Sequence, residues 1–570
     1  MKRRLAMCLV VCCLSAGVFA QDPSDRAVLQ VATKTIRPEQ LRAHIRFLAD
    51  SLLQGRAPGT AGYDIAAGYV ATELEGMGLH PGISGSGVSG GWFQNVPLAK
   101  AVTDEAASSL MLTVNGKEQK LADAKDYILS SWFASPAAKA GKAESDVSAP
   151  LVFVGFGVTA PDQKYDDYAG VDVHGKIVVD IYGAPSSFPS TERAYYSDGT
   201  VKSKNAVAHG AIGHLDIMLP EDWKRYPWDW LVPQIQMGEM HWLDKNGVPH
   251  DFFPELRGNA TLSEQGADKL FAGSPKTLDE VFATARASKP QAFPLKATAR
   301  IHTVAAQRVI QSANTVAELQ GSDPALRDQY VVYTAHVDHL GICPAVNGDN
   351  VCHGALDNAS GTSSLLEIAR AYASLPQPPR RSVLFVFVTG EEMGLLGSDY
   401  FAHFPAVPLK SIVANLNIDG APGAFSAMKD VVVLGVEHST LAGEVTSATG
   451  IMGYDVSPDP LPEEVFFIRS DQYSFVLQGV PAIDITDGVK AVDPKINLLE
   501  VEKKWMVTRY HTPLDSMDQP IDFGSMAKGS VLNFLVGYQV AQRDSAPEWN
   551  KGDFFGTTFG PRHFAESAGK

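Results

Sequence analysis

Four continuous apolar runs in the C-terminal half of the chain constrain its fold most strongly. They lie at 330–335, 382–389, 411–418 and 481–485. Runs that stay apolar without alternation are typical of strands buried on both faces of a sheet. Helical patterns at 360–374 and 470–477 lie between them. This alternation of strands and helices predicts an α/β fold in which helices sandwich a mostly parallel, mixed sheet.

The length of 570 residues predicts two or three domains. Amphipathic helices are expected at 38–52 and 60–78. From 150 to 295 the pattern changes to short apolar strands separated by Gly and Asp, which is typical of a compact β-rich domain. We therefore predict an N-terminal part at 25–139, an inserted β-rich domain at 140–295, the α/β domain at 296–545 and a polar tail at 546–570.

The first 20 residues have the layout of a secretory signal peptide. Lys2, Arg3 and Arg4 precede an apolar run at 5–18, and small residues lead to Ala20. The alternative is a membrane anchor, but the run is short for a span. A lipidated N-terminus is the other alternative, and it fits poorly because no lipobox precedes the cysteines at 12 and 13. Cleavage after Ala20 predicts a periplasmic or secreted protein with no membrane attachment.

The charge of the chain excludes one class of partner. The formal net charge is −16, and no long run of Lys or Arg is present. Such a chain would repel a phosphate backbone, so we expect no nucleic-acid partner. The sequence carries no signal for an oligomeric state.

Two cysteines would remain after signal cleavage, Cys343 and Cys352. In an oxidising compartment, cysteines this close in sequence favour one disulfide. The alternative joins them to His339 and His353 as a zinc knot.

Acidic and imidazole side chains follow the predicted strands. His336 and Asp338 follow the first run, Glu391 and Glu392 the second, and Asp419 the third, while Asp357 precedes the 360–374 helix and His511 comes late in the chain. Each has an ordinary explanation alone, such as a helix N-cap for Asp357 or a turn for Asp419. Ligands of open α/β sheets, however, gather beyond the carboxyl ends of the strands.

These groups would repel or desolvate one another at one sheet edge unless cations joined them. Imidazole nitrogen and carboxylate oxygen suit zinc where thiolates are absent. Two histidines and three carboxylates are enough for two metal ions if one carboxylate bridges.

The motifs resemble those of the M28 family of zinc aminopeptidases. The family pattern of H-x-D, D-N-x-S-G, E-E, a strand-end Asp and Y-H-T is matched at His336–Asp338, Asp357–Gly361, Glu391–Glu392, Asp419 and Tyr510–Thr512. The resemblance covers 300–540, and the helices at 38–80 resemble the family's N-terminal segment. The segment at 140–295 resembles the protease-associated (PA) domain often inserted in such enzymes. The resemblance therefore implies a zinc-exopeptidase fold with an inserted PA-like domain.

Carried over by position, the resemblance assigns a role to each motif residue. His336, Asp357 and Asp419 would hold one Zn²⁺, and Asp357, Glu392 and His511 would hold a second, with Asp357 bridging. Glu391 would be the general base, Asp338 would orient His336, and Tyr510 would donate to the developing oxyanion.

Two features depart from the family pattern. Gln472 stands where the family often has a His, so no catalytic role is assigned to it. The stretch between His336 and Asp357 is longer than in compact members and holds both cysteines. We expect it to form a disulfide-pinned loop at the rim of the site.

The expected function is an exported aminopeptidase that hydrolyses peptides with a free N-terminus. Two alternatives keep the scaffold: a carboxypeptidase for acidic peptides, for which Arg469 would be a candidate cation, and a glutaminyl cyclase, which would use one metal. A non-catalytic binding module is the third alternative, although such relatives lose metal ligands that this sequence retains.

Overall fold

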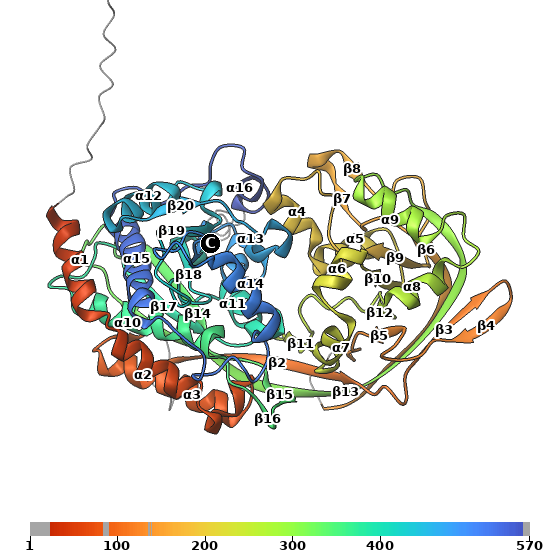
Figure 1. Cartoon of the computed structure of the whole chain (residues 1–570), viewed down its shortest axis with the longest axis horizontal. Coiled ribbons are helices and arrows are strands. Elements are labelled where there is room, and N and C mark those ends of the chain that lie inside the picture. Colours follow the sequence, from red (N-terminus) through yellow and green to blue (C-terminus); the bar gives the residue numbers. More distant parts are fainter. Residues whose placement is uncertain (1–22, 84–90, 135–136, 138–139, 562–570) are drawn as a thin grey trace, which may run out of the picture.

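The computed structural model describes residues 23–83, 91–134, 137 and 140–561, which form two lobes (Figure 1). The first lobe holds residues 23–83 and 311–561, and the second lobe holds residues 104–304. The predicted signal peptide lies outside the described residues. Among the helices of the described residues, none combines the length and the apolar character needed to cross a bilayer.

The first lobe is built on a mixed sheet with four central parallel strands. These strands are β17 (Ser382–Val388), β14 (Tyr330–His336), β18 (Ile412–Asn417) and β21 (Ala482–Asp487). On one side, the end of β13 (Phe293–Leu319) pairs antiparallel with β17, followed by β1 (His80–Pro81). On the other side, β19 (Asp430–Leu434) pairs antiparallel with β21 and parallel with β20 (Asp455–Ser457). All four predicted apolar runs are therefore strands of one sheet, which confirms the predicted fold class.

Helices cover both faces of this sheet. One face packs against α1 (Pro23–Thr35), α2 (Pro38–Leu48), α3 (Ala61–Gly76), α10 (Gly361–Ala373), α12 (Leu441–Met452) and α15 (Phe523–Gln542). The other face packs against α11 (Leu396–His403), α13 (Gln472–Leu477) and α16 (Phe554–Thr558). The core divides by strand alternation: Tyr333 faces the first group of helices, and Val332 faces the second. This burial on both faces is why the runs carry no polar alternation.

The second lobe contains a mixed sheet of its own. Its order is β4 (Lys117–Lys120), β3 (Ser109–Val114), β13, β6 (Gly141–Phe153), β9 (Ile177–Ile181), β10 (Gly213–Ile217), β12 (Asn259–Leu262) and β5 (Tyr127–Leu129). Beyond it lies the short hairpin of β7 (Thr159–Ala160) and β8 (Tyr165–Asp166). The helices are α4 (Ser190–Ser197), α5 (Gly199–Ala208), α6 (Pro220–Arg225), α7 (Trp228–Gln236), α8 (Glu264–Phe271) and α9 (Leu278–Arg286). The predicted β-rich region is thus a mixed α/β unit, and its core includes Leu110 and Tyr127, which precede the predicted boundary at 140.

A two-stranded ribbon joins the lobes. β13 pairs with β2 (Phe93–Thr103) over 305–315, and Figure 1 shows both strands running along the lower edge of the molecule from one lobe to the other. β11 (Glu239–Trp242) pairs with β2 and packs its Trp242 against Leu396 of the first lobe. On the opposite side, Ala194 of α4 belongs to the core of the first lobe. The lobes therefore touch through apolar contacts as well as through the ribbon.

Two segments differ from the sequence expectation. The region expected to be a polar tail contains α16, whose Phe555 is fully buried because it fills the face of the sheet beneath Phe467. Cys343 and Cys352 form a disulfide, as favoured, across the hairpin of β15 (Gly341–Val346) and β16 (Asp349–Cys352). This hairpin packs on the turn Ser51–Arg56, so closely that a Cβ on Gly55 would lie 2.4 Å from the oxygen of Gly341. This contact holds the hairpin against the turn. The hairpin lines neither of the two cavities at the candidate site described below.

Candidate active site

The carboxyl ends of the parallel strands bring the predicted residues together. His336 ends β14, Asp419 follows β18 by two residues, and Glu391 and Glu392 begin a short 3₁₀ turn after β17. Asp357 comes from the turn that precedes α10. His511 lies in the loop after α14 (Leu498–Thr508).

The carboxylate of Asp357 lies between two imidazoles. Its Oδ1 is 3.3 Å from His336 Nε2, and its Oδ2 is 3.2 Å from His511 Nε2. His336 Nε2 is also 3.3 Å from Asp419 Oδ1, and His511 Nε2 is 2.9 Å from Glu392 Oε2. The five residues thus form two groups that share Asp357: one with His336 and Asp419, the other with His511 and Glu392.

A third imidazole lies beside the second group. His339 Nδ1 contacts Glu392 Oε1, and the His339 ring meets the His511 ring edge-on at a centroid distance of 5.7 Å. His339 is fully buried, and its Nε2 has no hydrogen-bond partner among the described residues. From the sequence, His339 is a candidate only for a zinc knot, which the Cys343–Cys352 disulfide contradicts. The signal that could have placed it here is its position one residue after the H-x-D motif.

The turn that carries Asp357 is held by its neighbours in the D-N-x-S-G motif. Asn358 Nδ2 donates to Ile418 O at 2.9 Å, and Asn358 Oδ1 accepts from the backbone N–H of Gly361 and of Gly420. A Cβ at position 361 would lie 2.2 Å from Asn358 Oδ1, so glycine is required there. The motif therefore ties the Asp357 turn to the end of β18, where Asp419 lies.

Two buried side chains outside the predicted set complete this support. Asp515 accepts from the backbone N–H of Leu356 and of Asp357 at 3.0 Å each. The guanidinium of Arg56 is 1% exposed and donates to Val337 O at 2.8 Å and to Gly354 O at 3.2 Å. Arg56 therefore ties the end of β14 to the start of the Asp357 turn. Neither residue belongs to a periodic pattern or a motif, so the sequence does not point to either of them.

Three further side chains contact the ligand residues or the strand ends that carry them: Asp338, Glu391 and Gln472. His336 Nδ1 lies 3.2 Å from Asp338 O and 3.8 Å from Asp338 Oδ1, and Asp338 Oδ1 accepts from Glu391 N at 3.3 Å. Glu391 Oε2 is 3.9 Å from His336 Nε2. Gln472 Oε1 accepts from Asn417 Nδ2 at 2.9 Å, so it supports the end of β18.

Burial and charge act against one another in the site. Burial by itself would lower the pKa of His336, but Glu391, Asp357 and Asp419 outweigh it and raise that pKa well above its ordinary value. Burial would raise the pKa of Asp357, yet interactions with His336 and His511 hold it well below its usual range. Burial raises the pKa of Glu391 well above its usual range. His336 acts against this rise, and the charges of Asp419 and Glu392 add to it. Four carboxylates are thus crowded around imidazoles in a buried place.

This donor set fits divalent cations. Within the described residues, the ion pairs of Asp357, Glu391, Glu392 and Asp419 all involve histidines, and none involves Lys or Arg. His511 Nε2 is close to two carboxylates but forms no hydrogen bond of acceptable geometry within the described part of the chain. Nitrogen and oxygen atoms that converge without hydrogen bonding are what metal coordination requires, and these ligand types suit zinc.

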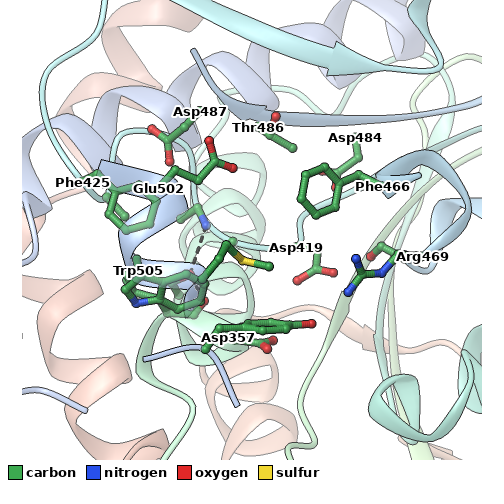
Figure 2. A pocket seen from close by; sticks show the side chains of 18 of the residues that line it. Asp357, Asp419, Phe425, Phe466, Arg469, Asp484, Thr486, Asp487, Glu502 and Trp505 are labelled. Carbon is green, nitrogen blue, oxygen red and sulfur yellow. Dashed lines mark hydrogen bonds between the residues drawn. The ribbon is translucent and has the colours of Figure 1, made fainter. Parts of the chain in front are cut away.

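Two cavities open onto the site. The first, of about 980 Å³ with its mouth, is lined by Asp357, Glu391, Asp419 and Tyr510 and extends toward Asp487 and Glu502 (Figure 2). The second, of about 1660 Å³ including the open space at its mouth, is lined by Glu391, Glu392, Tyr510 and His511 and by residues of the second lobe, including Lys204 and Asp251. Tyr510 stacks on His511 with a ring distance of 3.7 Å. The site is therefore open to a substrate from the space between the lobes.

Comparison with known proteins places this part of the chain in a family. Residues 314–532 match the model of "Peptidase family M28". A "probable leucine aminopeptidase 2" of Aspergillus oryzae is 31% identical over 244 residues, which are 42% of this chain and 46% of that protein. "Aminopeptidase YwaD" of Bacillus subtilis is 28% identical over 223 residues, 38% of this chain and 43% of that protein. This chain thus matches less than half of the length of each of these two relatives.

A further relative and a solved structure add two facts. A "probable glutamate carboxypeptidase AMP1" of Arabidopsis thaliana is 36% identical over 112 residues, 19% of this chain and 14% of that protein. An aminopeptidase from Aneurinibacillus sp. strain AM-1 has a similar fold, with a TM-score of 0.53, 19% identity, and coverage of 91% of this chain and 97% of that one. The relatives carry different activities in their names, so the reaction has to be argued from the site. Residues 314–532 of the chain therefore match peptidase family M28, and the fold of the chain is similar to that of a solved aminopeptidase.

Proposed function

We propose that the protein is an exported dinuclear zinc aminopeptidase that removes N-terminal residues from peptides. The observation that carries this proposal is the carboxylate of Asp357, whose two oxygens each face a different imidazole at 3.3 and 3.2 Å. Asp357 would be the ligand shared by two cations, with His336 and Asp419 as further ligands of one and His511 and Glu392 as further ligands of the other. The relatives named as aminopeptidases support the reaction type.

The residues of the chain divide the work of peptide hydrolysis. The residues around Asp357 would hold zinc, and zinc bound there would supply Lewis acidity toward water and the scissile carbonyl. Glu391 borders both cavities and is the general base: it accepts the proton of the attacking water and passes it to the departing amine. The C–O bond forms first, the C–N bond then breaks, and the proton moves from water to the departing amine, so no other reactant is needed.

Three further residues position these groups. Asp338 faces His336 Nδ1 and accepts from the backbone N–H of Glu391, so it holds both the ligand and the base in place. Tyr510, stacked on His511, donates a hydrogen bond to the oxyanion that develops on the substrate. His339, which contacts Glu392, orients that carboxylate.

The charges around the site favour an aminopeptidase over a carboxypeptidase. A carboxypeptidase needs a free cation for the substrate carboxylate. Arg469 lines both cavities, but its Nη1 is paired with Glu464, 3.8 Å from Oε2 and 3.3 Å from the backbone oxygen, and its guanidinium lies 5.5 Å from the ring centroid of Phe466. The first cavity also presents Asp487 and Glu502, which would repel an acidic substrate. A glutaminyl cyclase with one metal has no use for the second group of ligands.

The test is hydrolysis of amino-acid p-nitroanilides and their N-acetylated counterparts by wild type, Glu391→Gln and Glu500→Gln. Glu500 is exposed on α14 and serves as the control. We expect cleavage of free-amine substrates only, loss of activity with a chelator, and a fall of about 100- to 10,000-fold in kcat for Glu391→Gln with two zinc ions retained. Wild type that carries two metal ions and cleaves no member of the panel would contradict the proposal, and so would equal cleavage of the N-acetylated substrates.

A further inference from the structure

The cavity at the site ends in a pair of acidic side chains that the reaction does not use. Asp487 is the last residue of β21, and Glu502 lies on α14. Figure 2 shows the two carboxylates side by side at one end of the pocket, away from Asp357. Within the described part of the chain, one of their four carboxylate oxygens has a backbone partner: Asp487 Oδ1 accepts from Gly423 N at 2.8 Å.

Aromatic side chains form much of the wall between the metal ligands and this acidic pair, together with the polar side chains of Thr486, Asp484 and Arg469. Trp505 lies 5.6 Å from the ring of Tyr510 and 5.8 Å from the ring of Phe425, so aromatic rings line one side from the site outward. Phe466 lies on the other side in Figure 2. Such a pocket accepts a long aliphatic stem, and its end accepts a polar head.

Among the residues that the structure describes, Asp487 and Glu502 form no ion pair with a lysine, arginine or histidine. Burial, followed by the charge of Glu502, raises the pKa of Asp487 to about 7. Burial, followed by the charge of Asp459, raises the pKa of Glu502 to about 7, and the cation that acts against this is Lys503, an exposed side chain. Arg469 lies on the opposite side of the pocket in Figure 2 and is engaged by Glu464. The end of the pocket therefore presents two half-buried carboxylates that a positive group of a ligand would stabilise.

We infer that this pocket binds the side chain of the substrate's first residue and selects lysine or arginine through Asp487 and Glu502. The inference rests on the proposed aminopeptidase function. The free α-amine is one carbon from the scissile carbonyl, so it must lie beside the metal ligands and not at the far end of the pocket. The cation of a lysine or arginine side chain lies at the end of a stem of three or four methylenes, and it reaches outward from the site. The aromatic walls add cation–π contacts.

The test compares kcat/KM for the p-nitroanilides of lysine, arginine, leucine and methionine. The variants are Glu502→Gln and Asp487→Asn, with Glu500→Gln as the exposed control on the same helix. We expect wild type to prefer lysine and arginine over leucine by about 10-fold or more, and each variant to lower kcat/KM for the basic substrates by about 10- to 100-fold while leucine is unchanged or improved. A preference for leucine in wild type, or an equal loss for all four substrates in the variants, would overturn the inference.

Binding separates this inference from the proposed function. Titration calorimetry with free L-arginine, L-lysine and L-leucine, which cannot be hydrolysed, tests the pocket even if no p-nitroanilide is cleaved. The pocket predicts that L-arginine and L-lysine bind wild type at least about 10-fold tighter than L-leucine, and that Glu502→Gln removes the difference. Equal affinity for the three amino acids would count against the inference, whatever the enzyme does to peptides.

Discussion

Each lobe contains a buried cluster of histidine and aspartate, and the two clusters differ in how their charge is balanced. In the second lobe, Asp180 on β9 lies opposite Asp216 on β10, and His214 Nε2 lies 2.9 Å from Asp180 and 3.5 Å from Asp216. Lys202 of α5 places its Nζ 3.8 Å from Asp180 Oδ1 and donates to Ile181 O at 2.6 Å. The lysine and the histidine together balance the two carboxylates.

The cluster of the first lobe has no such internal balance. Among the described residues, its four carboxylates pair with imidazoles only. Histidine and aspartate side chains therefore have a structural role in one lobe and a cation-binding role in the other. With a lysine from a neighbouring helix they join β9, β10 and α5 into one core, whereas without it they form a site that needs cations from solution.

Substitution of one carboxylate in each lobe should give the largest difference between the two clusters. We expect Asp357→Asn to lower kcat/KM by about 1,000-fold or more and to reduce bound zinc, because the shared ligand of both cations is lost. Asp180→Asn makes the same chemical change in the other cluster. It should leave zinc content and activity near those of wild type while lowering the free energy of unfolding by about 3 kcal/mol. Metal analysis, kinetics and urea denaturation of both variants check this; loss of zinc from Asp180→Asn would show that the second cluster is also a metal site.

Much of this contrast could be predicted from sequence, and the reason is geometric. Uninterrupted apolar runs mark buried parallel strands, and the carboxyl ends of such strands meet at one edge, so His336, Glu392 and Asp419 could be grouped before any coordinates. The lysine that neutralises Asp180 could not be found this way, because α5 approaches β9 only in the folded lobe.

Three other features also left no signal in the sequence. Arg56 lies in a turn and donates to backbone carbonyl oxygens. Every residue has a carbonyl oxygen, so the sequence does not show which ones an arginine will bind. β13 runs for 27 residues across both lobes, but its mixture of exposed and buried positions predicts no single long strand. Phe555 packs from a segment that is polar overall. Tertiary contacts, and not local patterns, decide each of these cases.

Substitution of Lys202 should give an effect of intermediate size on the stability of the second lobe. Lys202→Met keeps most of the volume of the side chain but leaves two opposed carboxylates with His214 alone, which should lower the free energy of unfolding by about 3 kcal/mol. Lys204→Met is the matched control, because its ion pair with Asp251 is exposed, at 3.0 Å, and should contribute less than about 1 kcal/mol. Urea denaturation followed by circular dichroism measures both. Equal effects of the two substitutions would mean that Lys202 does not balance the buried cluster.

The smallest expected effect is a dependence of stability on pH that belongs to the second lobe. Burial tends to lower the pKa of His214, but Asp180, followed by Asp216, raises it from 6.5 to about 9 in the folded state. A raised pKa means that the folded state holds the proton more tightly than the unfolded state. The stabilisation is therefore complete below pH 6.5 and is lost as the pH rises toward 9, with a size on the order of 2 kcal/mol. In His214→Gln this loss between pH 6.5 and 9 should be absent, whereas wild type and Lys204→Met should both show it in urea denaturation at a series of pH values. A loss that persists in His214→Gln would place the titrating group elsewhere and remove the charge balance argued here for the second cluster.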